Sequence, residues 1–323
     1  MIWSALPGGQ SAALIPDLRN LHLSPARAAA GLISVVQQRR VAVPASVPTA
    51  DCPILVIGGL PLGGAGRTPA TIFLARLLRS RGRRVAILGH GYRAQRSPIR
   101  RAGDRRTDGD EAIELSRALP DVPVWLGRPR WQAAQQAARH ADVILSDGGL
   151  GARDLRASTS IVLHDATQAL SVFPVGRLRF PLTVWDAAPL RWLHRVDEPG
   201  ALTMAADVES VWRPAAVLGP DGAPLPARAL LGSWVAVSGI ARPGSFEHAL
   251  AQVGITPVEH RAFPDHHRFR RAELQTPPGC RLVTTAKDAA RLPPGHDLHV
   301  LEGGLHVVRG EAALSAFLAT WGL

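Results

Sequence analysis

The feature that most constrains the fold is a glycine-rich loop at residues 58–69, GGLPLGGAGRTP. It follows an apolar run, Ile54 to Ile57, that predicts a buried strand, and it precedes residues 70–80, where apolar side chains recur at helical spacing. Backbone N–H groups in such a loop turn toward an anion, and the N-terminus of the next helix adds its positive dipole end. Strand, glycine loop and helix in this order predict a phosphate-binding site.

The loop departs from the full P-loop pattern at two positions. That pattern has Gly where Pro61 stands and Lys where Arg67 stands, while Thr68 is the hydroxyl residue that usually binds Mg²⁺. The loop alone therefore does not identify the site.

Composition limits the class of protein. With 323 residues, 46% of them apolar, the chain suits two medium domains or one large one. Its two cysteines, Cys52 and Cys280, are too few for a disulfide framework and indicate a reducing compartment. The first residues lack the pattern of a signal peptide, and no apolar run approaches the roughly 18 residues of a spanning helix. We therefore expect neither a secreted nor a membrane-spanning protein.

The basic residues are unusual in kind and in distribution. The net charge is +11, and all but one of the 37 basic residues are Arg, the exception being Lys287. A general preference for Arg codons explains this bias and also Arg67, and the surviving Lys287 is then expected to contact nucleotide or phosphate. Residues 76–106 hold eleven Arg against one acid, which suggests a membrane surface, a phosphorylated substrate, nucleic acid or a solvated face. Tyr92 is the only aromatic residue among the Arg residues of this segment. Since proteins that bind single-stranded nucleic acid stack bases on aromatic side chains, no nucleic acid partner is expected.

Alternating strands and helices predict an α/β fold with a P-loop-type, mainly parallel sheet flanked by helices, and a second smaller α/β domain. In such sheets ligands bind beyond the C-terminal ends of the strands, where Gly63 to Thr68, Asp110 and Asp147 fall. The expected strands after the loop are 84–88, 122–126, 142–147 and 160–164, and the expected helices are 109–119 and 129–140.

We expect four parts along the chain. Residues 1–50 form a helical segment whose apolar face and basic flanks suit either a membrane interface or packing on the protein. Residues 51–185 form the nucleotide-binding domain, and the proline-rich stretch 165–230 is irregular, with 186–230 as the connection. Residues 231–323 form the second domain, with strands at 234–238, 257–260, 281–285, 298–301 and 305–308, and helices at 243–252, 286–292 and 310–321, the last packing back on the first domain.

Several polar residues suit catalysis, and each has an ordinary structural explanation. Asp147 ends an apolar strand, as the Mg²⁺-associated carboxylate of P-loop enzymes does, but turns also place Asp there. Asp110 and Glu111 begin a helix, where the dipole favours acids in any case. His266 and His267 follow Asp265 on a loop, and without a Cys cluster or HExxH motif a catalytic His is a better interpretation than a metal site.

Taken together, these motifs resemble the tetraacyldisaccharide 4′-kinase (lipid A 4′-kinase) family from about residue 30 to the C-terminus. Residues 53–58 and 63–69 resemble that family's strand and VGGTGKTP loop, and residues 89–92 resemble its SRGYGG. Further counterparts follow in order at 109–111, 124–128, 146–150, 262–267 and 285–289. The string AFPDHHRF and the double glycine before Thr68 and Pro69 are the most specific of these.

The resemblance implies transfer of phosphate from ATP, with Mg²⁺, to the 4′-hydroxyl of a tetraacyl disaccharide 1-phosphate in lipid A biosynthesis. It also implies a peripheral protein at the cytoplasmic face of the bacterial inner membrane. By position, Asp110 would take the proton of the sugar hydroxyl with support from His266. The implied nucleotide-binding residues are Gly63, Gly64, Ala65, Gly66, Arg67, Thr68 and Lys287, and the implied Mg²⁺ ligands are Thr68, Glu111 and Asp147.

This chain departs from the family pattern near the phosphate and metal positions. The family's DDGLQ is DGGLG at residues 147–151, so a carboxylate and a Gln are missing, and the loop Lys is Arg67. Arg keeps the charge but is bulkier and forked. A diverged relative that binds ATP but has another acceptor or little activity is therefore the alternative, and a nucleic-acid-binding ATPase is the third hypothesis.

Overall fold

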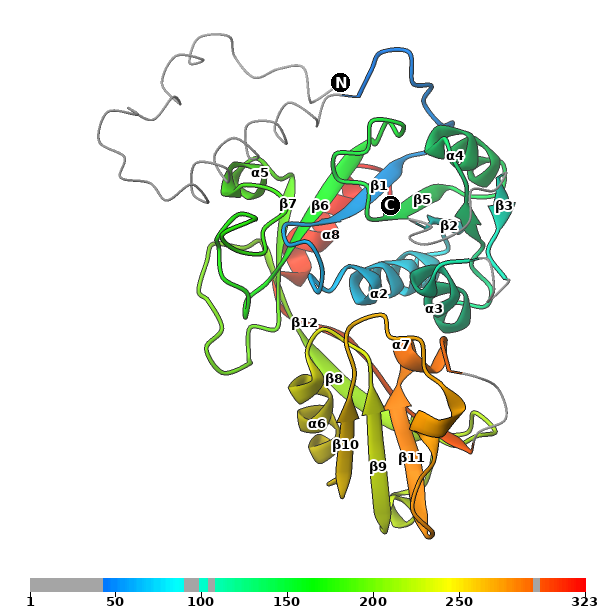
Figure 1. The fold of residues 1–323 in the computed structure, drawn as a ribbon. Coiled ribbons are helices and arrows are strands. Elements are labelled where there is room, and N and C mark those ends of the chain that lie inside the picture. The colour runs from blue at the N-terminus through cyan, green and yellow to red at the C-terminus, as the bar shows by residue number, and fades with distance from the viewer. Residues whose placement is uncertain (1–42, 90–98, 104–107, 293–296) are drawn as a thin grey trace, which may run out of the picture.

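Two lobes share one twelve-stranded sheet (Figure 1). The structure, a computed structural model, describes residues 43–89, 99–103, 108–292 and 297–323. The strand order is β10-β9-β11-β12-β8-β7-β6-β1-β5-β2-β4-β3. Strands β8 and β12 pair antiparallel, as do β3 and β4, and every other described pair is parallel. The predicted α/β fold with a mainly parallel sheet is confirmed.

The first lobe contains seven strands and four helices of the described chain. The strands are β1 (Ile54–Gly59), β2 (Val85–Leu88), β3 (Arg100–Arg101), β4 (Val124–Leu126), β5 (Val143–Asp147), β6 (Thr159–Asp165) and β7 (Leu190–His194). The helices are α2 (Arg67–Ser80), α3 (Asp110–Ala118), α4 (Arg130–Ala138) and α5 (Leu182–Asp186).

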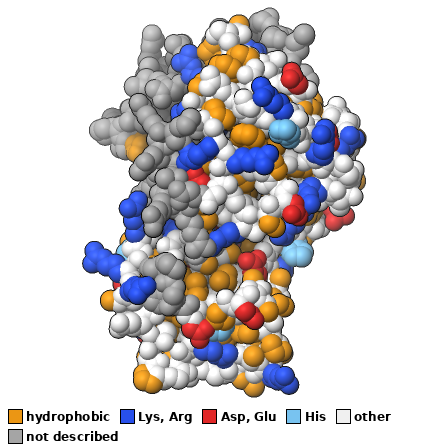
Figure 2. Space-filling model, turned by 90° about the vertical axis from the view of Figure 1, so that its right-hand side faces the viewer, with side chains coloured by type: hydrophobic (Ala, Val, Ile, Leu, Met, Phe, Trp, Pro, Cys, Tyr) orange, Lys and Arg blue, Asp and Glu red, His pale blue; other side chains and the backbone are white. Residues whose placement is uncertain are grey.

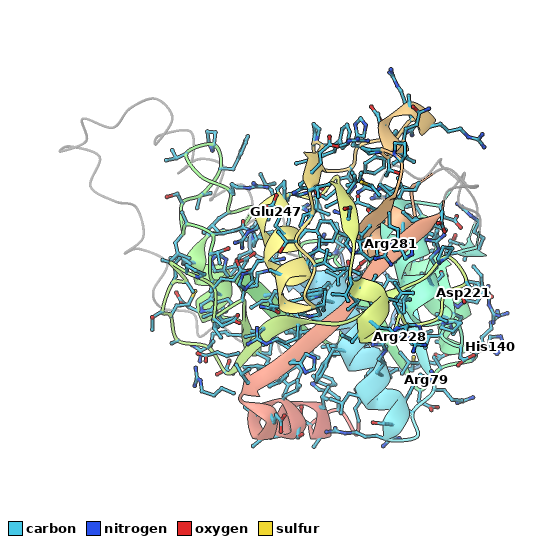
Figure 3. All side chains as sticks on the ribbon, turned by 90° about the horizontal axis from the view of Figure 1, so that it is seen from below. Arg79, His140, Asp221, Arg228, Glu247 and Arg281 are labelled. Carbon is cyan, nitrogen blue, oxygen red and sulfur yellow. The ribbon has the colours of Figure 1, made fainter. Side chains whose placement is uncertain are left out.

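The second lobe is smaller and lies in front when the molecule is seen from below (Figure 3). It contains β9 (Ser233–Ser238), β10 (Glu259–Ala262), β11 (Cys280–Thr285), α6 (Pro243–Gln252) and α7 (Ala286–Ala289), with short 3₁₀ turns at Ala227–Leu230 and Arg271–Leu274. Arg281, labelled in Figure 3, covers the ring of Trp234 with its guanidinium carbon 3.8 Å from the ring centroid. The long strands β8 (Val208–Leu218) and β12 (Leu298–Arg309) run through both lobes, and α8 (Glu311–Ala319) follows β12.

The core of the first lobe places the glycine loop. All six residues of β1 are buried, since β5 and β6 pair with its two edges and helices cover both faces. Leu55 of β1 packs in one cluster with Leu74 of α2 and with Leu314 and Leu318 of α8, so the C-terminal helix contacts the first lobe. Helix α4 covers the opposite face through a second cluster. The strand and helix that flank the loop are therefore fixed by the core.

Three expectations about secondary structure need correction. Residues 165–230, predicted to be irregular, include α5 and the strands β7 and β8, which continue the sheet from β6 at the pair Ile161–Leu190. Prolines flank β7, and its Arg191 hides the apolar pattern, but that side chain pairs with Asp207 at 2.8 Å. The two late strands predicted at 298–301 and 305–308 form one strand, β12, with an irregularity at Gly303. The helix predicted at 286–292 ends at Ala289.

The N-terminal segment of residues 1–50 is only partly described. Residues 43–50 form neither helix nor strand, and the predicted helical part at 1–42 lies outside the described residues, as does most of the motif at 89–92.

Several Arg residues in the described part of the Arg-rich segment 76–106 form ion pairs. Arg79 pairs with Asp121, and Arg84 pairs with Asp142 at 2.6 Å. On the face drawn in Figure 2, Lys and Arg side chains are spread over the first lobe among other atoms instead of forming one patch.

Candidate active site

The glycine loop has the geometry of an anion site. Gly66 precedes α2 with φ 80°, and a Cβ there would lie 2.6 Å from His194, so this position requires glycine. No side chain caps the first turn of α2, and since Pro69 has no N–H and Ala70 N donates to the Gly66 carbonyl at 3.0 Å, the N–H groups of Arg67 and Thr68 are the ones available to a ligand. Gln168 Nε2 donates to the carbonyl oxygen of Gly63 at 3.2 Å and supports the loop from the side.

Two carboxylates lie beside the end of this loop. Thr68 Oγ1 donates to Asp147 Oδ2 at 3.0 Å, and Arg67 pairs with Glu111 at 3.4 Å. Asp147 is 1% exposed, and its Oδ1 is buried without a hydrogen-bond partner. Burial raises the pKa of Asp147 above its usual value, and the charge of Arg67 opposes this shift. The buried carboxylate oxygen and the Thr68 hydroxyl are oxygen ligands of the kind that a hard cation prefers.

The metal interpretation needs ligands from outside the protein. No three His, Cys, Asp or Glu side chains gather as a metal site within the described ranges. Mg²⁺ is commonly held by one or two carboxylates together with substrate phosphates and water, so the arrangement at Asp147 and Thr68 fits that ion.

A carboxylate–imidazole pair joins the two lobes. His266, on the loop after β10, donates from Nδ1 to Oδ2 of Asp110 at the start of α3, with a distance of 3.1 Å. His266 has φ 63°, a left-handed conformation that non-glycine residues rarely adopt outside functional sites and turns. The hydrogen bond from His266 lowers the pKa of Asp110, while burial acts in the opposite direction and raises it. Because the net shift is downward, the carboxyl group is ionised at neutral pH. His267 points elsewhere and pairs with Glu273 at 3.0 Å.

Sequence reasoning missed Arg291, which follows α7. Its side chain is 6% exposed, its Nη1 lies 3.7 Å from Asp110 Oδ2, and its Nη2 donates to the Gly239 carbonyl at 2.9 Å. The same carbonyl accepts the His266 backbone N–H at 3.2 Å. Buried Asp288 pairs with Arg291 and accepts from Gly239 N at 3.0 Å. Arg291 lies four residues after Lys287, but in a chain rich in Arg that spacing gave no signal.

Lys287 lies at the same junction. Its Nζ pairs with Asp265 Oδ1 at 2.8 Å, and Asp265 also lies 3.7 Å from His266 Nε2. Lys287 and Gly66 line a cavity of about 1250 Å³ between the lobes. Gly66 of the first lobe and Lys287 of the second therefore face one cavity, and Lys287 also contacts the Asp265 carboxylate.

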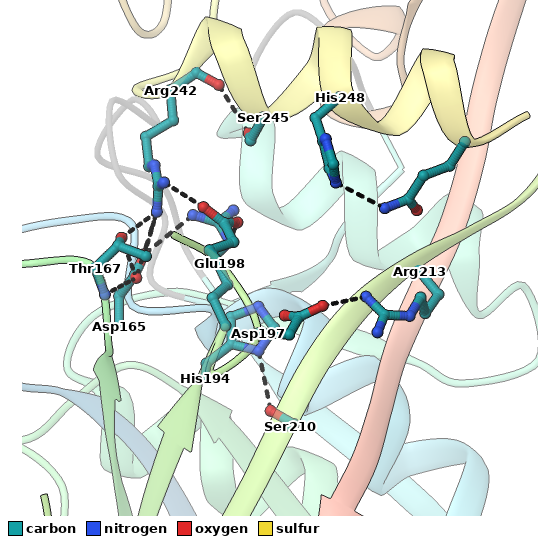
Figure 4. A network of polar contacts seen from close by, with 12 residues as sticks. Asp165, Thr167, His194, Asp197, Glu198, Ser210, Arg213, Arg242, Ser245 and His248 are labelled. Atoms are coloured by element: carbon teal, nitrogen blue, oxygen red, sulfur yellow. Dashed lines mark hydrogen bonds and ion pairs between the residues drawn. The ribbon is translucent and has the colours of Figure 1, made fainter. Parts of the chain in front are cut away.

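An ion network on the other side of this cavity also joins the lobes (Figure 4). Arg242, at the start of α6, pairs with Asp165 at 3.4 Å and also contacts Thr167 and Glu198. Asp165 is fully buried and pairs with Arg195 at 3.0 Å. Apart from Arg242, these residues come from the stretch 165–230 that was predicted to be irregular, and for that reason the sequence did not indicate them.

A second, basic pocket of about 460 Å³ lies next to the Asp147 loop, and its lining includes Arg128, Arg130 and Arg179. Arg130 is 5% exposed, and its Nη1 is buried without a hydrogen-bond partner. Gly149 has φ 113°, and a Cβ there would lie 2.5 Å from that nitrogen. Buried guanidinium groups without partners are costly, so this pocket suits an anionic ligand.

A glycine loop at the end of a parallel strand, a hydroxyl–carboxylate pair and an Asp–His pair between the two lobes define a phosphotransferase of the P-loop type. The comparisons with known proteins name the family. Residues 19–321 match the family described as Tetraacyldisaccharide-1-P 4′-kinase, and the chain belongs to that family.

Individual relatives agree with this assignment. A tetraacyldisaccharide 4′-kinase of Anaeromyxobacter dehalogenans (strain 2CP-C) is 38% identical over 98% of this chain and 93% of its own. One from Methylobacterium sp. (strain 4-46) is 37% identical over 93% of this chain and 92% of its own. The crystal structure of LpxK from Aquifex aeolicus in complex with ATP has a TM-score of 0.74 at 22% identity, covering 91% of this chain and 99% of that one, which shows the shared fold. The family resemblance of the sequence motifs is confirmed.

Proposed function

We propose that this chain transfers the terminal phosphate of ATP to the 4′-hydroxyl of a tetraacyl disaccharide 1-phosphate, a step of lipid A biosynthesis. The observation that carries the proposal is the Asp110–His266 pair, which lies between the lobes at 3.1 Å. A carboxylate held by an imidazole is a proton acceptor for a hydroxyl group. Membership of the tetraacyldisaccharide-1-P 4′-kinase family supports both the donor and the acceptor.

Phosphoryl transfer asks the protein mainly to position the reactants and to neutralise charge. The N–H groups at the start of α2 and the guanidinium of Arg67 would bind the phosphates of ATP, with Lys287 at the opposite wall of the cavity. Asp110 would accept the hydroxyl proton while His266 keeps the carboxylate oriented. Bound Mg²⁺ would supply charge neutralisation on the phosphates, and Thr68 and Asp147, with Glu111 beside them, would hold it.

The basic pocket supports the acceptor assignment. The acceptor named by the family carries a phosphate, and Arg128, Arg130 and Arg179 line a pocket beside Asp147. We place the phosphate of the acceptor there, since Arg binds phosphate oxygens through two N–H groups at once.

The acceptor also indicates where in the cell the protein acts. No helix within the described ranges is long and apolar enough to cross a bilayer. An acceptor with four acyl chains stays in a membrane, so we place the protein at the cytoplasmic face of the bacterial inner membrane as a peripheral protein, where ATP is present.

The test is a direct assay with purified protein, Mg·ATP and the disaccharide 1-phosphate. We expect a bis-phosphorylated product, and loss of that product in the variant Asp110→Ala. Tight ATP binding without product from this acceptor would instead favour the diverged relative, whose supporting observations are Arg67 and the missing carboxylate at Gly148.

A further inference from the structure

A short hairpin places exposed apolar side chains beside the glycine loop. Residues 171–178 fold back on themselves, with Leu178 N donating to Ser171 O and Phe173 N donating to Leu178 O, both at 2.9 Å. Leu62, the residue before Gly63, donates its backbone N–H to the carbonyl oxygen of Arg177 at 2.8 Å. The hairpin and the phosphate-binding loop are therefore bonded to each other.

The base of the hairpin is fixed while its tip is exposed. Leu178 and Phe180 are buried in one cluster with Leu60, the residue after β1. At the tip, Phe173 is 46% exposed and Val175 is 47% exposed. Leu62 beside them is 53% exposed, so three of the seven exposed large hydrophobic residues of the described chain lie at this one place. Exposed apolar side chains that gather in one place mark an interaction site, whereas single ones do not.

The segment that contains the tip carries charge of one sign. Between Asp165 and Asp186 the chain contains no acidic residue, and it contains Arg177 and Arg179, both exposed. Apolar tips next to Arg side chains match the interface of an anionic bilayer, where acyl chains lie just below negatively charged headgroups.

We propose that Leu62, Phe173, Val175 and Arg177, called the docking rim below, seat this protein on an anionic lipid bilayer. The proposal rests on the proposed function, because a tetraacyl acceptor keeps its sugar hydroxyls in the headgroup layer. That layer is only about 5–8 Å thick on each side of a bilayer. A loop that delivers phosphate to such a hydroxyl must bring its neighbouring surface to the acyl boundary, and the docking rim is the surface that adjoins the glycine loop.

The first test measures partition of the full chain onto vesicles that contain phosphatidylglycerol, without ATP or acceptor. The variant Phe173→Ser with Val175→Ser is compared with a control, Leu231→Ser with Val258→Ser, which removes side chains that are 76% and 65% exposed in the second lobe. We expect the rim variant to lose at least about tenfold in partition and the control to bind like the wild type. Equal partition of wild type, rim variant and control overturns the proposal.

The second test reports on contact directly. A spin label is placed at Val175→Cys or at Leu231→Cys, in a chain with Cys52→Ser and Cys280→Ser, and its exposure to oxygen and to a water-soluble nickel complex is measured with vesicles. We expect the label at position 175 to become accessible to oxygen and shielded from nickel, while the label at 231 stays in water. A label at 175 that remains in water overturns the proposal. This result would also be obtained if the docking rim binds a protein and not a bilayer. Both tests are independent of turnover, so their failure differs from failure of the kinase assay.

Discussion

The bond between His266 and Asp110 gives the sharpest functional prediction, and replacement of His266 by Ala tests it. His266 is 20% exposed and Asp110 31% exposed in their side chains, so their 3.1 Å hydrogen bond is partly shielded from water. A hydrogen bond to a charged group contributes about 1.5–3 kcal/mol, which corresponds to a loss of about 10- to 150-fold in kcat. Assays at saturating Mg·ATP and acceptor measure that loss.

A second substitution separates the hydrogen bond from backbone strain. Asn tolerates the left-handed conformation that His266 adopts at φ 63°, and its amide nitrogen can take the place of Nδ1. His266→Asn is therefore expected to recover most of the lost rate, with a remaining loss of about tenfold or less. His266→Ala is also expected to lower the free energy of unfolding by about 1 kcal/mol, because Ala has no side-chain hydrogen bond to offset the strain.

The matched control is the adjacent histidine. His267 pairs with Glu273 and stacks on Phe263, with ring centroids 4.4 Å apart. His267→Ala is expected to keep kcat within about threefold, since a group with no contact to the reacting atoms adds little. If His266→Ala retains the wild-type kcat, or if both Ala variants lose the same factor, the role assigned to the Asp110–His266 pair is wrong.

Three further predictions concern other groups of the site. Burial raises the pKa of Glu114 to about 7 from the usual 4.5, so wild-type stability should fall relative to Glu114→Gln as the pH rises through that window. Chemical denaturation should find Glu114→Gln more stable by about 1–3 kcal/mol at pH 8 and equal to wild type near pH 4.5. Thr68→Val should raise the Mg²⁺ concentration for half-maximal rate by about tenfold, whereas Thr68→Ser should not, because only Val lacks the hydroxyl; equal titrations would remove Thr68 from the metal site. Arg291→Met should lower the free energy of unfolding by about 3 kcal/mol, since it leaves buried Asp288 without its cation, and urea denaturation measures this.

The fold of the first lobe was predictable because its signals are local. Ile54 to Ile57 form a continuous apolar run with a glycine loop after it, and a strand buried on both faces needs such a run. The strand β7 has the same environment but contains Arg191 and lies between prolines, so its pattern resembles a loop. What stabilises β7 is its pairing with β6 and β8 and the burial of Trp192 and Leu193. Arg191 is accommodated by pairing with Asp207, a partner that only the folded chain supplies.

The site was predictable to the extent that a motif carried it. Thr68 and Asp147 were expected to act together, and they lie in contact at 3.0 Å. The roles of Asp110, His266 and Lys287 stay predictions, although the three are connected by side-chain contacts at the junction of the lobes. Arg291 and Arg130 could not be found, because nearly every basic residue of this chain is Arg and the sequence does not show which few of them are buried.

The two departures from the family pattern at the phosphate site, Arg67 in place of Lys and Gly148 in place of Asp, both change the charge of the site, and their effects depend on each other. Arg67 pairs with Glu111 and also opposes the raised pKa of Asp147, so one guanidinium serves both carboxylates near the loop. A further carboxylate at residue 148 would add negative charge next to buried Asp147 and raise its pKa more. The backbone does not forbid Asp at residue 148, because φ 78° lies in the left-handed region that Asp tolerates. Gly149 differs, since the buried guanidinium of Arg130 occupies the space of a side chain there. Gly148 therefore changes the charge of the site relative to the family pattern, whereas Gly149 is required because a side chain would not fit there. With Gly148, the positive charge of Arg67 faces one buried carboxylate at the end of β5.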